Sequence, residues 1–314
     1  MSSEAQGRVK LLLEGDRRSL TRVLTWVENG LPEGRDAMRR LFPKSGRAHI
    51  IGITGPSGSG KSTLTGALVR ELRKRGKTVG IVAVDPTSPY SHGAILGDRI
   101  RMQDLTADPG VFIRSMATRG ALGGLAAATN DLVTVLDAAG NDIVIVETVG
   151  AGQDEVEVAD TAHTTIVVNI PGAGDDMQAI KAGILEIADI LVVNKADLPQ
   201  AEAVFKQLHI YTDLQRQAGW DVPILKTVAH KDQGAGELAD TIEKHREYLA
   251  ESGRLEEMRR QRARRQLLAV TQAVLLEGVL AKAGNRVDEL VEQIARREID
   301  PRSAAEKLID SSKP

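Results

Sequence analysis

The stretch from Gly55 to Thr63 constrains the fold of this chain more than any other part of its sequence. It reads Gly-Pro-Ser-Gly-Ser-Gly-Lys-Ser-Thr and matches G-x-x-x-x-G-K-S, the pattern of a phosphate-binding loop. A short apolar, β-branched segment (49–54) precedes it, and a segment with leucines at helical spacing (64–75) follows it. A strand, a glycine-rich turn and a helix in this order direct backbone N–H groups and a helix N-terminus at one point. The sequence therefore predicts a site for nucleotide phosphates.

Two side chains of this loop have specific expected tasks. We expect Lys61 to reach the β- and γ-phosphates and the hydroxyl of Ser62 to ligate Mg²⁺. The rest of the loop is expected to enclose the phosphates. Its nucleotide-contacting residues are predicted to be Gly55, Ser57, Gly58, Ser59, Gly60, Lys61, Ser62 and Thr63.

Composition limits the classes of function open to the chain. Its 314 residues carry a net charge of −2, whereas a general nucleic-acid binder is normally clearly basic. The chain has no cysteine, which excludes disulfides, thiolate zinc sites and a cysteine nucleophile. Its first residues are charged, unlike a signal peptide, and no stretch approaches the roughly 18 apolar residues of a membrane span. We therefore expect a cytoplasmic protein that binds neither nucleic acid nor membrane.

Between residues 47 and 250, apolar segments of strand length alternate with segments of helical periodicity. This alternation is typical of an α/β fold with a mostly parallel sheet that helices cover on both faces. Ligands of such sheets lie beyond the carboxyl ends of the strands, and the motifs fall there. Strands are predicted over 48–54, 78–85, 111–114, 142–147, 164–170, 190–194 and 222–227. Helices are predicted over 62–75, 98–106, 122–139, 176–187, 200–218 and 236–250.

The two ends of the chain, 1–46 and 251–314, are predicted to be helical extensions of this nucleotide-binding domain. The first has apolar residues at helical spacing and is expected to brace the domain, with partner binding as the alternative. The second begins with an arginine-rich run, which is expected to be a solvated helix face. An apolar stripe follows that must be buried against the domain or a second copy, so we predict a homodimer. The stripe consists of Leu268, Val270, Val274, Leu275, Val279 and Leu280.

The segment from Ile190 to Asp197 is a hydrophobic strand that ends in Asn-Lys-Ala-Asp, an N-K-x-D pattern. The Asp197 carboxylate can accept hydrogen bonds from the N1–H and 2-amino groups of guanine, and adenine lacks these donors. Asn194 can bond the far edge of the ring, and the stem of Lys195 can lie over its face. Because a buried carboxylate without a partner penalises the wrong base, we expect GTP rather than ATP. A backbone N–H for guanine O6 is expected from Thr227, Val228 and Ala229.

Three acidic residues are placed to serve a Mg²⁺ ion, which prefers oxygen ligands. Asp85 ends one predicted strand and Glu147 ends another, in Glu-Thr-Val-Gly, where many GTPases have D-x-x-G. Asp98 follows the loop at 86–97. An acid that closes an apolar run can also be a simple polar strand end, but two such acids on strands beside the phosphate loop favour metal binding.

A glycine-containing loop after Glu147 is a candidate nucleotide switch, because its glycines allow a movement that the γ-phosphate can order. Gln153 in this loop is the candidate for orienting the attacking water, with a solvated loop residue as the alternative. The candidate catalytic residues are therefore Lys61, Glu147 and Gln153. A second glycine-rich loop at 171–181 is either another nucleotide-sensing element or a helix start capped by an aspartate.

With these residues in place, the sequence resembles the MeaB/ArgK family, GTPases associated with methylmalonyl-CoA mutase, over nearly the whole chain. The resemblance rests on the phosphate loop, on 194–197 and on long blocks between them. These blocks include Val-Asp-Pro-Thr-Ser-Pro (84–89), Gly-Ala-Ile-Leu-Gly-Asp-Arg (93–99), Phe-Ile-Arg-Ser-Met-Ala-Thr-Arg-Gly (112–120) and Val-Glu-Thr-Val-Gly (146–150). Ala151 and Asp154 depart from the valine and serine that are common in the family.

The resemblance implies more than the motifs show. It implies a chaperone that binds and hydrolyses GTP, gates adenosylcobalamin loading and exchange in a cobalamin-dependent acyl-CoA mutase, and protects that mutase. It also implies GTP/GDP and Mg²⁺ as ligands, the acids Asp85, Asp98 and Glu147 at the metal, and helical ends that brace and dimerise. A P-loop kinase and a GTPase metallochaperone are the alternatives. The N-K-x-D segment argues against the first, and the lack of cysteine argues against the second.

Overall fold

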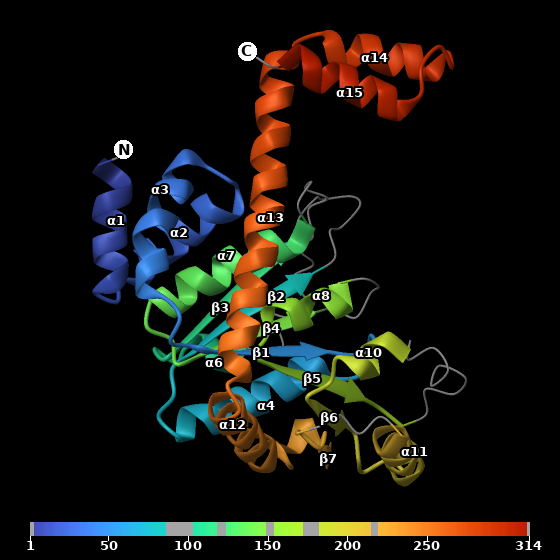
Figure 1. The fold of residues 1–314 in the computed structure, drawn as a ribbon. Coiled ribbons are helices and arrows are strands. Elements are labelled where there is room, and N and C mark those ends of the chain that lie inside the picture. Colours follow the sequence, from blue (N-terminus) through green and yellow to red (C-terminus); the bar gives the residue numbers. More distant parts are fainter. Residues whose placement is uncertain are drawn as a thin grey trace. The chain divides into compact units, whose positions relative to one another are not determined.

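The computed structural model of the chain describes residues 3–85, 103–117, 124–148, 154–171, 182–214 and 219–312. They form two compact units, of which the first ends at Arg260 and the second contains the chain from Gln261 onward. The first unit holds the sheet, the N-terminal helices and the phosphate-binding loop (Figure 1). The boundaries at residues 46 and 250 that the sequence suggests stay a prediction.

The first unit is built on a parallel sheet (Figure 1). In the described residues the sheet has seven strands in the order β3-β2-β4-β1-β5-β6-β7, and each neighbouring pair is parallel. The α/β class is thus confirmed, and β1 lies at the centre, between β4 and β5. The strands are β1 (His49–Thr54), β2 (Val79–Asp85), β3 (Val111–Ala117), β4 (Ile143–Thr148), β5 (Thr164–Asn169), β6 (Ile190–Val193) and β7 (Ile224–Lys226).

Helices cover both faces of the sheet. The core on one face contains residues of α4 and α12, and the core on the other contains residues of α7 and α8. A third cluster joins α10 and α11 to β5 and β6. The sequence pattern did not predict α8, and parts of the predicted helices at 98–106, 122–139, 176–187 and 200–218 lie outside the described residues. The helices are α4 (Lys61–Lys74), α6 (Gln103–Thr106), α7 (Gly124–Ala138), α8 (Asp154–Thr161), α10 (Ala182–Glu186), α11 (Ala201–Leu214) and α12 (Ala235–Glu251).

Side chains of the central strands alternate between the two main cores. In β4, Val144 and Val146 belong to the core with α7, whereas Ile143 and Ile145 belong to the core with α4 and α12. Successive side chains of a strand point to opposite faces of its sheet. Glu147 therefore continues the series of Ile143 and Ile145, and its carboxylate faces α4, the helix that starts at the phosphate-binding loop.

The N-terminal helices share a hydrophobic core with the sheet. Leu12, Leu24 and Leu41 are almost fully buried in this core, beside residues of β2 and β4. The carboxylate of Glu28 also pairs with the guanidinium of Arg114 on β3. These contacts support the expected bracing role of the segment. Its helices are α1 (Ser3–Leu13), α2 (Arg17–Glu28) and α3 (Pro32–Leu41).

A chain of polar side chains, of which His49, Thr164 and His245 are buried, lies where β1 and β5 begin, at the edge of the sheet opposite the phosphate-binding loop. Nε2 of His49 lies 2.8 Å from Oγ1 of Thr164, which lies 2.9 Å from Nδ1 of His245. Nε2 of His245 is in turn 3.4 Å from the Asp189 carboxylate. Burial lowers the pKa of His49 to about 3 and that of His245 to about 4, so both rings are neutral near pH 7. Burial also raises the pKa of Asp189 to about 7.

The second unit is helical. It contains the larger part of α13 (Arg254–Ala283), together with α14 (Arg286–Ala295) and α15 (Pro301–Ser312). Leu290 of α14 and Ala304 of α15 are buried. The apolar residues of α13 are exposed instead, with Leu267 at 67% and Leu275 at 64%. In the part of the chain that the structure describes, the apolar stripe expected from the sequence is therefore largely exposed.

One helix of the described chain, α13, is long and apolar enough to cross a membrane by length and composition alone. An 18-residue window of it has a mean hydropathy of 1.3, and none of this window is buried. This corrects the expectation that no segment approaches a membrane span. The expectation counted uninterrupted apolar residues, whereas an average over a window tolerates isolated charges.

Candidate functional site

The phosphate-binding loop connects the end of β1 to the start of α4. Gly55 and Gly60 have φ angles of 139° and 86°, which side chains disfavour. A Cβ atom on Gly55 would lie 2.3 Å from the carbonyl oxygen of Val168, and one on Gly60 would lie 2.5 Å from Nδ2 of Asn194. Glycine at these two positions therefore lets the loop pack closely against β5 and against the residue that follows β6.

Lys61 is the first residue of α4 and is 6% exposed. Its Nζ donates to the carbonyl oxygens of Gly55 at 2.8 Å and Pro56 at 3.0 Å, so the ammonium group lies within the loop. The N-terminus of α4, which carries a partial positive charge, begins at the same residue. A cation and a helix N-terminus at one point attract an anionic group such as phosphate.

The carboxylate of Glu147 is buried against α4 and engages two hydroxyl groups of that helix. Ser62 Oγ donates to Glu147 Oε1 at 2.6 Å, and Thr65 Oγ1 donates to Glu147 Oε2 at 2.7 Å. Residues three apart lie on the same face of a helix, which explains why both hydroxyls reach one carboxylate. A hydroxyl and a carboxylate are the oxygen donors that Mg²⁺ prefers, so Ser62 and Glu147 fit this ion.

Asn194 connects three segments of the chain. Its Nδ2 donates to the carbonyl oxygen of Ser59 at 2.9 Å. Its Oδ1 accepts hydrogen bonds from Thr227 Oγ1 at 3.1 Å and from the Ala229 N–H at 3.2 Å. The structure therefore brings the phosphate-binding loop, the N-K-x-D segment and the turn after β7 together, although Ser59 and Asn194 are 135 positions apart.

Lys195 and Asp197 extend this junction. Lys195 has a φ of 55°, and its Nζ donates to the carbonyl oxygen of Gly58 at 3.0 Å, so its stem spans from the N-K-x-D segment to the loop. The Asp197 side chain is exposed, and its Oδ2 lies 3.4 Å from Nζ of Lys231. The carboxylate that is expected to read the base is thus accessible and already has a cationic neighbour.

The turn at 227–229 lies beside Asn194, in the region expected to bind the base. Its N–H groups already have acceptors in the protein. Those of Thr227 and Val228 donate to backbone carbonyls at 2.9 and 3.0 Å, and that of Ala229 donates to Asn194. For the Ala229 N–H to bond guanine O6, it must share or leave this acceptor.

Part of the predicted site falls outside the described residues. Asp98 and Gln153 lie there, together with most of both glycine-rich loops. Asp85 ends β2, where its backbone pairs with Ala117, but its side chain is outside the description. Ser57 is exposed in the phosphate-binding loop, and Thr63 is half-buried on α4.

Among the described residues, Thr65 and Lys231 contact predicted site residues although the motifs did not single them out. Thr65 could have been found from its position three residues after Ser62, which places both on one face of a helix. Lys231 has no comparable signal, because only the turn after β7 brings it near Asp197.

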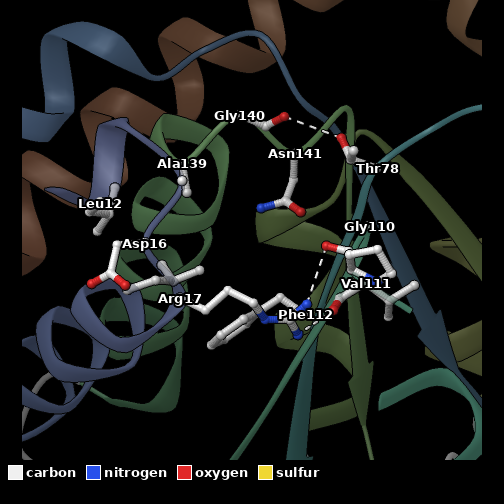
Figure 2. Close-up of a pocket in the computed structure, with 13 residues that line it drawn as sticks. Leu12, Asp16, Arg17, Thr78, Gly110, Val111, Phe112, Ala139, Gly140 and Asn141 are labelled. Atoms are coloured by element: carbon white, nitrogen blue, oxygen red, sulfur yellow. Dashed lines mark hydrogen bonds between the residues drawn. The ribbon is translucent and has the colours of Figure 1, made fainter. Parts of the chain in front are cut away.

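A small cavity of about 150 Å³ lies at the edge of the sheet where β2, β3 and β4 begin (Figure 2). Arg17 extends across it and donates to the carbonyl oxygens of Pro109 at 3.2 Å and Val111 at 2.7 Å. Its guanidinium also lies 5.7 Å from the centre of the Phe112 ring. The cavity lies between α2 and the start of β3, and it does not belong to the site around the phosphate-binding loop.

A parallel sheet with a phosphate-binding loop after its central strand, joined through Asn194 to an N-K-x-D segment, defines a P-loop GTPase. A family model described as methylmalonyl Co-A mutase-associated GTPase MeaB matches residues 20–284. The chain belongs to this family, which confirms the resemblance noted from its sequence.

Known proteins similar to the chain support this membership. A putative GTPase of Pyrococcus abyssi is 49% identical over 307 residues, with 96% of this chain and 94% of that protein covered. GTPase ArgK of Escherichia coli is 36% identical over 282 residues, with 87% and 85% covered. The crystal structure of a LAO/AO transport system kinase matches with a TM-score of 0.74 at 26% identity and covers 99% of this chain and 98% of that one. The chain is therefore a GTPase that binds guanine nucleotides.

Proposed function

We propose that this GTPase is a chaperone of a cobalamin-dependent acyl-CoA mutase, either methylmalonyl-CoA mutase or a close relative. In this proposal it gates the loading and exchange of adenosylcobalamin through GTP binding and hydrolysis, and it protects the mutase. The description of the family, which names association with that mutase and matches residues 20–284, supports the partner. The hydrogen bond from Asn194 to Ser59 is the observation that supports nucleotide binding, because it joins the phosphate-binding loop and the proposed base-binding segment in one site.

At the base, Asp197 is proposed to accept hydrogen bonds from the N1–H and 2-amino groups of guanine. Its exposure leaves the carboxylate open to a ligand, and the Lys231 ammonium 3.4 Å away neutralises part of its charge until the base arrives. The stem of Lys195, anchored at the Gly58 carbonyl, is placed to lie over one face of the ring.

At the phosphates, Lys61 is proposed to exchange the carbonyl oxygens of Gly55 and Pro56 for the β- and γ-phosphate oxygens. An anionic acceptor makes a stronger hydrogen bond to an ammonium group than a neutral carbonyl does. Among the described residues, the buried Oγ of Ser59 has no hydrogen-bond partner, so this loop also offers a free hydroxyl to a ligand.

Ser62 and Glu147 are the described residues proposed to hold Mg²⁺, with Asp85 and Asp98 as further acids. When bound, this ion neutralises charge on the phosphates and orients them for transfer. Ser62 directs its proton at Glu147, which keeps the hydroxyl and the carboxylate side by side. Gln153 is proposed to orient the attacking water.

A homodimer formed through α13 is part of the proposal. Leu267 and Leu268 are adjacent, so they point about 100° apart around the helix, and both are more than half exposed. A helix that is apolar on several faces is normally buried. A second copy of the chain offers a matching apolar surface. A cytoplasmic location, which the sequence composition favours, is also part of the proposal.

The proposal is tested by GTP turnover of the purified chain with and without a purified candidate mutase, and by transfer of adenosylcobalamin to that mutase. We expect slow basal turnover that the mutase accelerates, and cofactor transfer that depends on GTP. The Lys61→Ala variant is the control that should lose both effects. Equal use of ATP would favour the kinase alternative, and turnover indifferent to each candidate mutase would contradict the chaperone role.

A further inference from the structure

We propose that Thr65 is a positioning residue for the Mg²⁺ site: its hydroxyl holds one oxygen of Glu147 so that the other stays directed at Ser62. The inference rests on the proposed role of Ser62 and Glu147 at the metal. Nothing in the phosphate-binding motif, which ends before Thr65, assigns this residue a task.

The geometry at Glu147 is the first argument. Its two carboxylate oxygens accept from two different hydroxyls of α4, at 2.6 Å from Ser62 and 2.7 Å from Thr65. The last side-chain torsion of a glutamate is broad, so a contact to each of the two oxygens restrains the carboxylate plane more than a contact to one of them. The second contact fixes the plane.

The behaviour of other helical threonines is the second argument. A threonine inside a helix commonly donates its hydroxyl to the backbone carbonyl four residues earlier. Thr65 is fully buried, yet its hydroxyl is directed across to β4 and donates to Glu147. The described threonines that do bond the carbonyl four residues earlier are Thr21, Thr25, Thr134, Thr241 and Thr271.

The alternation of side chains along β4 is the third argument. Glu147 faces α4 because it continues the series of Ile143 and Ile145, and a buried ionised carboxylate needs hydrogen-bond donors on that face. Thr65 supplies one donor without a positive charge. A positive side chain there would compete with Mg²⁺ for the carboxylate. A threonine therefore orients the acid and leaves its charge available to the ion.

The test compares Thr65→Val, which removes the hydroxyl at nearly constant volume, with Thr65→Ser, which keeps it. Binding of a fluorescent GDP analogue is titrated with Mg²⁺, and its release is timed with Mg²⁺ and with EDTA. We expect Thr65→Val to need about tenfold more Mg²⁺ than the wild type for the same binding of the GDP analogue. Loss of a residue that hydrogen-bonds a metal ligand usually weakens metal binding by at least this factor. We expect the affinity of Thr65→Val in EDTA to be unchanged and Thr65→Ser to behave like the wild type.

Thr241→Val is the matched control, since it removes a buried helical hydroxyl that bonds only the Glu237 carbonyl in its own helix. Should Thr65→Val fail to fold, Thr65→Ala removes the same hydroxyl with a smaller side chain. An unchanged Mg²⁺ requirement in the hydroxyl-free variants would overturn the inference, as would an equal loss of affinity with and without Mg²⁺. A wild type whose nucleotide binding ignores Mg²⁺ would instead overturn the proposed metal site.

Discussion

The side-chain amide of Asn194 donates to the backbone carbonyl of Ser59 at 2.9 Å. This bond fixes the distance between the base-reading segment and the phosphate-binding loop before a nucleotide arrives. The same amide nitrogen lies where a Cβ on Gly60 would clash, at 2.5 Å. The two halves of the site are therefore packed against each other, and a small change in one should be measurable in the other.

Gly60→Ala is expected to weaken GDP binding strongly and to lower the free energy of unfolding by about 2–3 kcal/mol. The positive φ costs about 1–2 kcal/mol, and displacing the Asn194 amide adds the loss of a hydrogen bond. Gly58→Ala is the matched control, because its φ is also positive at 77° but nothing lies within 4 Å of its Cβ position. Urea denaturation and nucleotide titration of both variants check this. Equal effects at the two positions would contradict the tight contact.

Lys61→Ala is expected to abolish tight GTP binding, measured by nucleotide titration, because the loop loses the cation that is proposed to bind the phosphates. Lys206→Ala, on the exposed face of α11, removes the same charge elsewhere and should leave the affinity unchanged. If Lys61→Ala retained wild-type affinity, the loop would not be the nucleotide site.

Asp197→Asn is expected to weaken GTP binding about 100-fold, since two hydrogen bonds to a charged acceptor are lost. The same variant should gain relative affinity for xanthosine triphosphate, whose 2-oxo group accepts from an amide donor. Competition titrations with both nucleotides measure the ratio. Lys231→Gln should keep the guanine preference, because an exposed ion pair contributes only about 0–1 kcal/mol. If Asp197→Asn gained no relative affinity for xanthosine triphosphate, the proposal that Asp197 binds guanine would be refuted.

The buried histidines His49 and His245 should make the fold sensitive to acid. Their pKa values in the folded state are about 3 and about 4, below the ordinary 6.5, so below pH 6.5 the unfolded chain binds protons that the folded chain does not. The stability they contribute is present above pH 6.5 and is lost as the pH falls toward 4. Urea midpoints between about pH 4.5 and 7.5 are the measurement, and they cover the upper part of this range.

Asp189 acts in the opposite direction. Its pKa is raised to about 7, so between its unfolded value of 3.8 and pH 7 the folded chain binds the extra proton. Acidification through this range therefore favours the folded state at this one group. Asp189→Asn should steepen the loss of stability on acidification, whereas His49→Gln should flatten it. Identical pH profiles for wild type and both variants would contradict these assignments.

Replacing Leu268 and Leu275 together by lysine is expected to convert a dimer into a monomer. Light scattering after gel filtration measures the mass, and nucleotide affinity should not change because the site lies in the other unit. Gln272→Lys adds the same charge to an exposed polar position of the same helix and should leave the dimer intact. A monomeric wild type that binds lipid vesicles would show that α13 is covered by a membrane instead.

The sheet was predictable from the sequence because its signals are local. Short apolar runs rich in β-branched residues, such as 190–193, are typical of buried strands, and the phosphate-binding loop identifies its strand and helix directly. The N-K-x-D segment could be placed at the same site because both motifs follow predicted strands of one parallel sheet, and the carboxyl ends of such strands lie at one edge. The spacing of apolar residues and of motifs along the chain can be read from one sequence.

Other features could not be read in this way. The pairs Thr65–Glu147 and Lys231–Asp197 depend on which side chains meet across 82 and 34 positions, and no local pattern encodes that. A backbone N–H of residues 227–229 is expected to bond guanine O6, but nothing in the sequence indicates that the Ala229 N–H donates to Asn194, because a buried amide oxygen takes a donor that only the fold brings near. Helix α8 was missed because its residues follow a glycine-containing loop and lack a long apolar period.

The alternation of side chains along β4 has a consequence for how this family can change its length. Glu147 faces α4 because it lies two and four positions after Ile145 and Ile143, which belong to the core on that face, and its proposed role at the metal depends on this spacing. Deleting or inserting one residue within the strand would turn the acid toward α7 and present a neighbouring threonine or valine to the loop. Natural variation in chain length should therefore accumulate in the turn before β4 and leave the strand itself untouched.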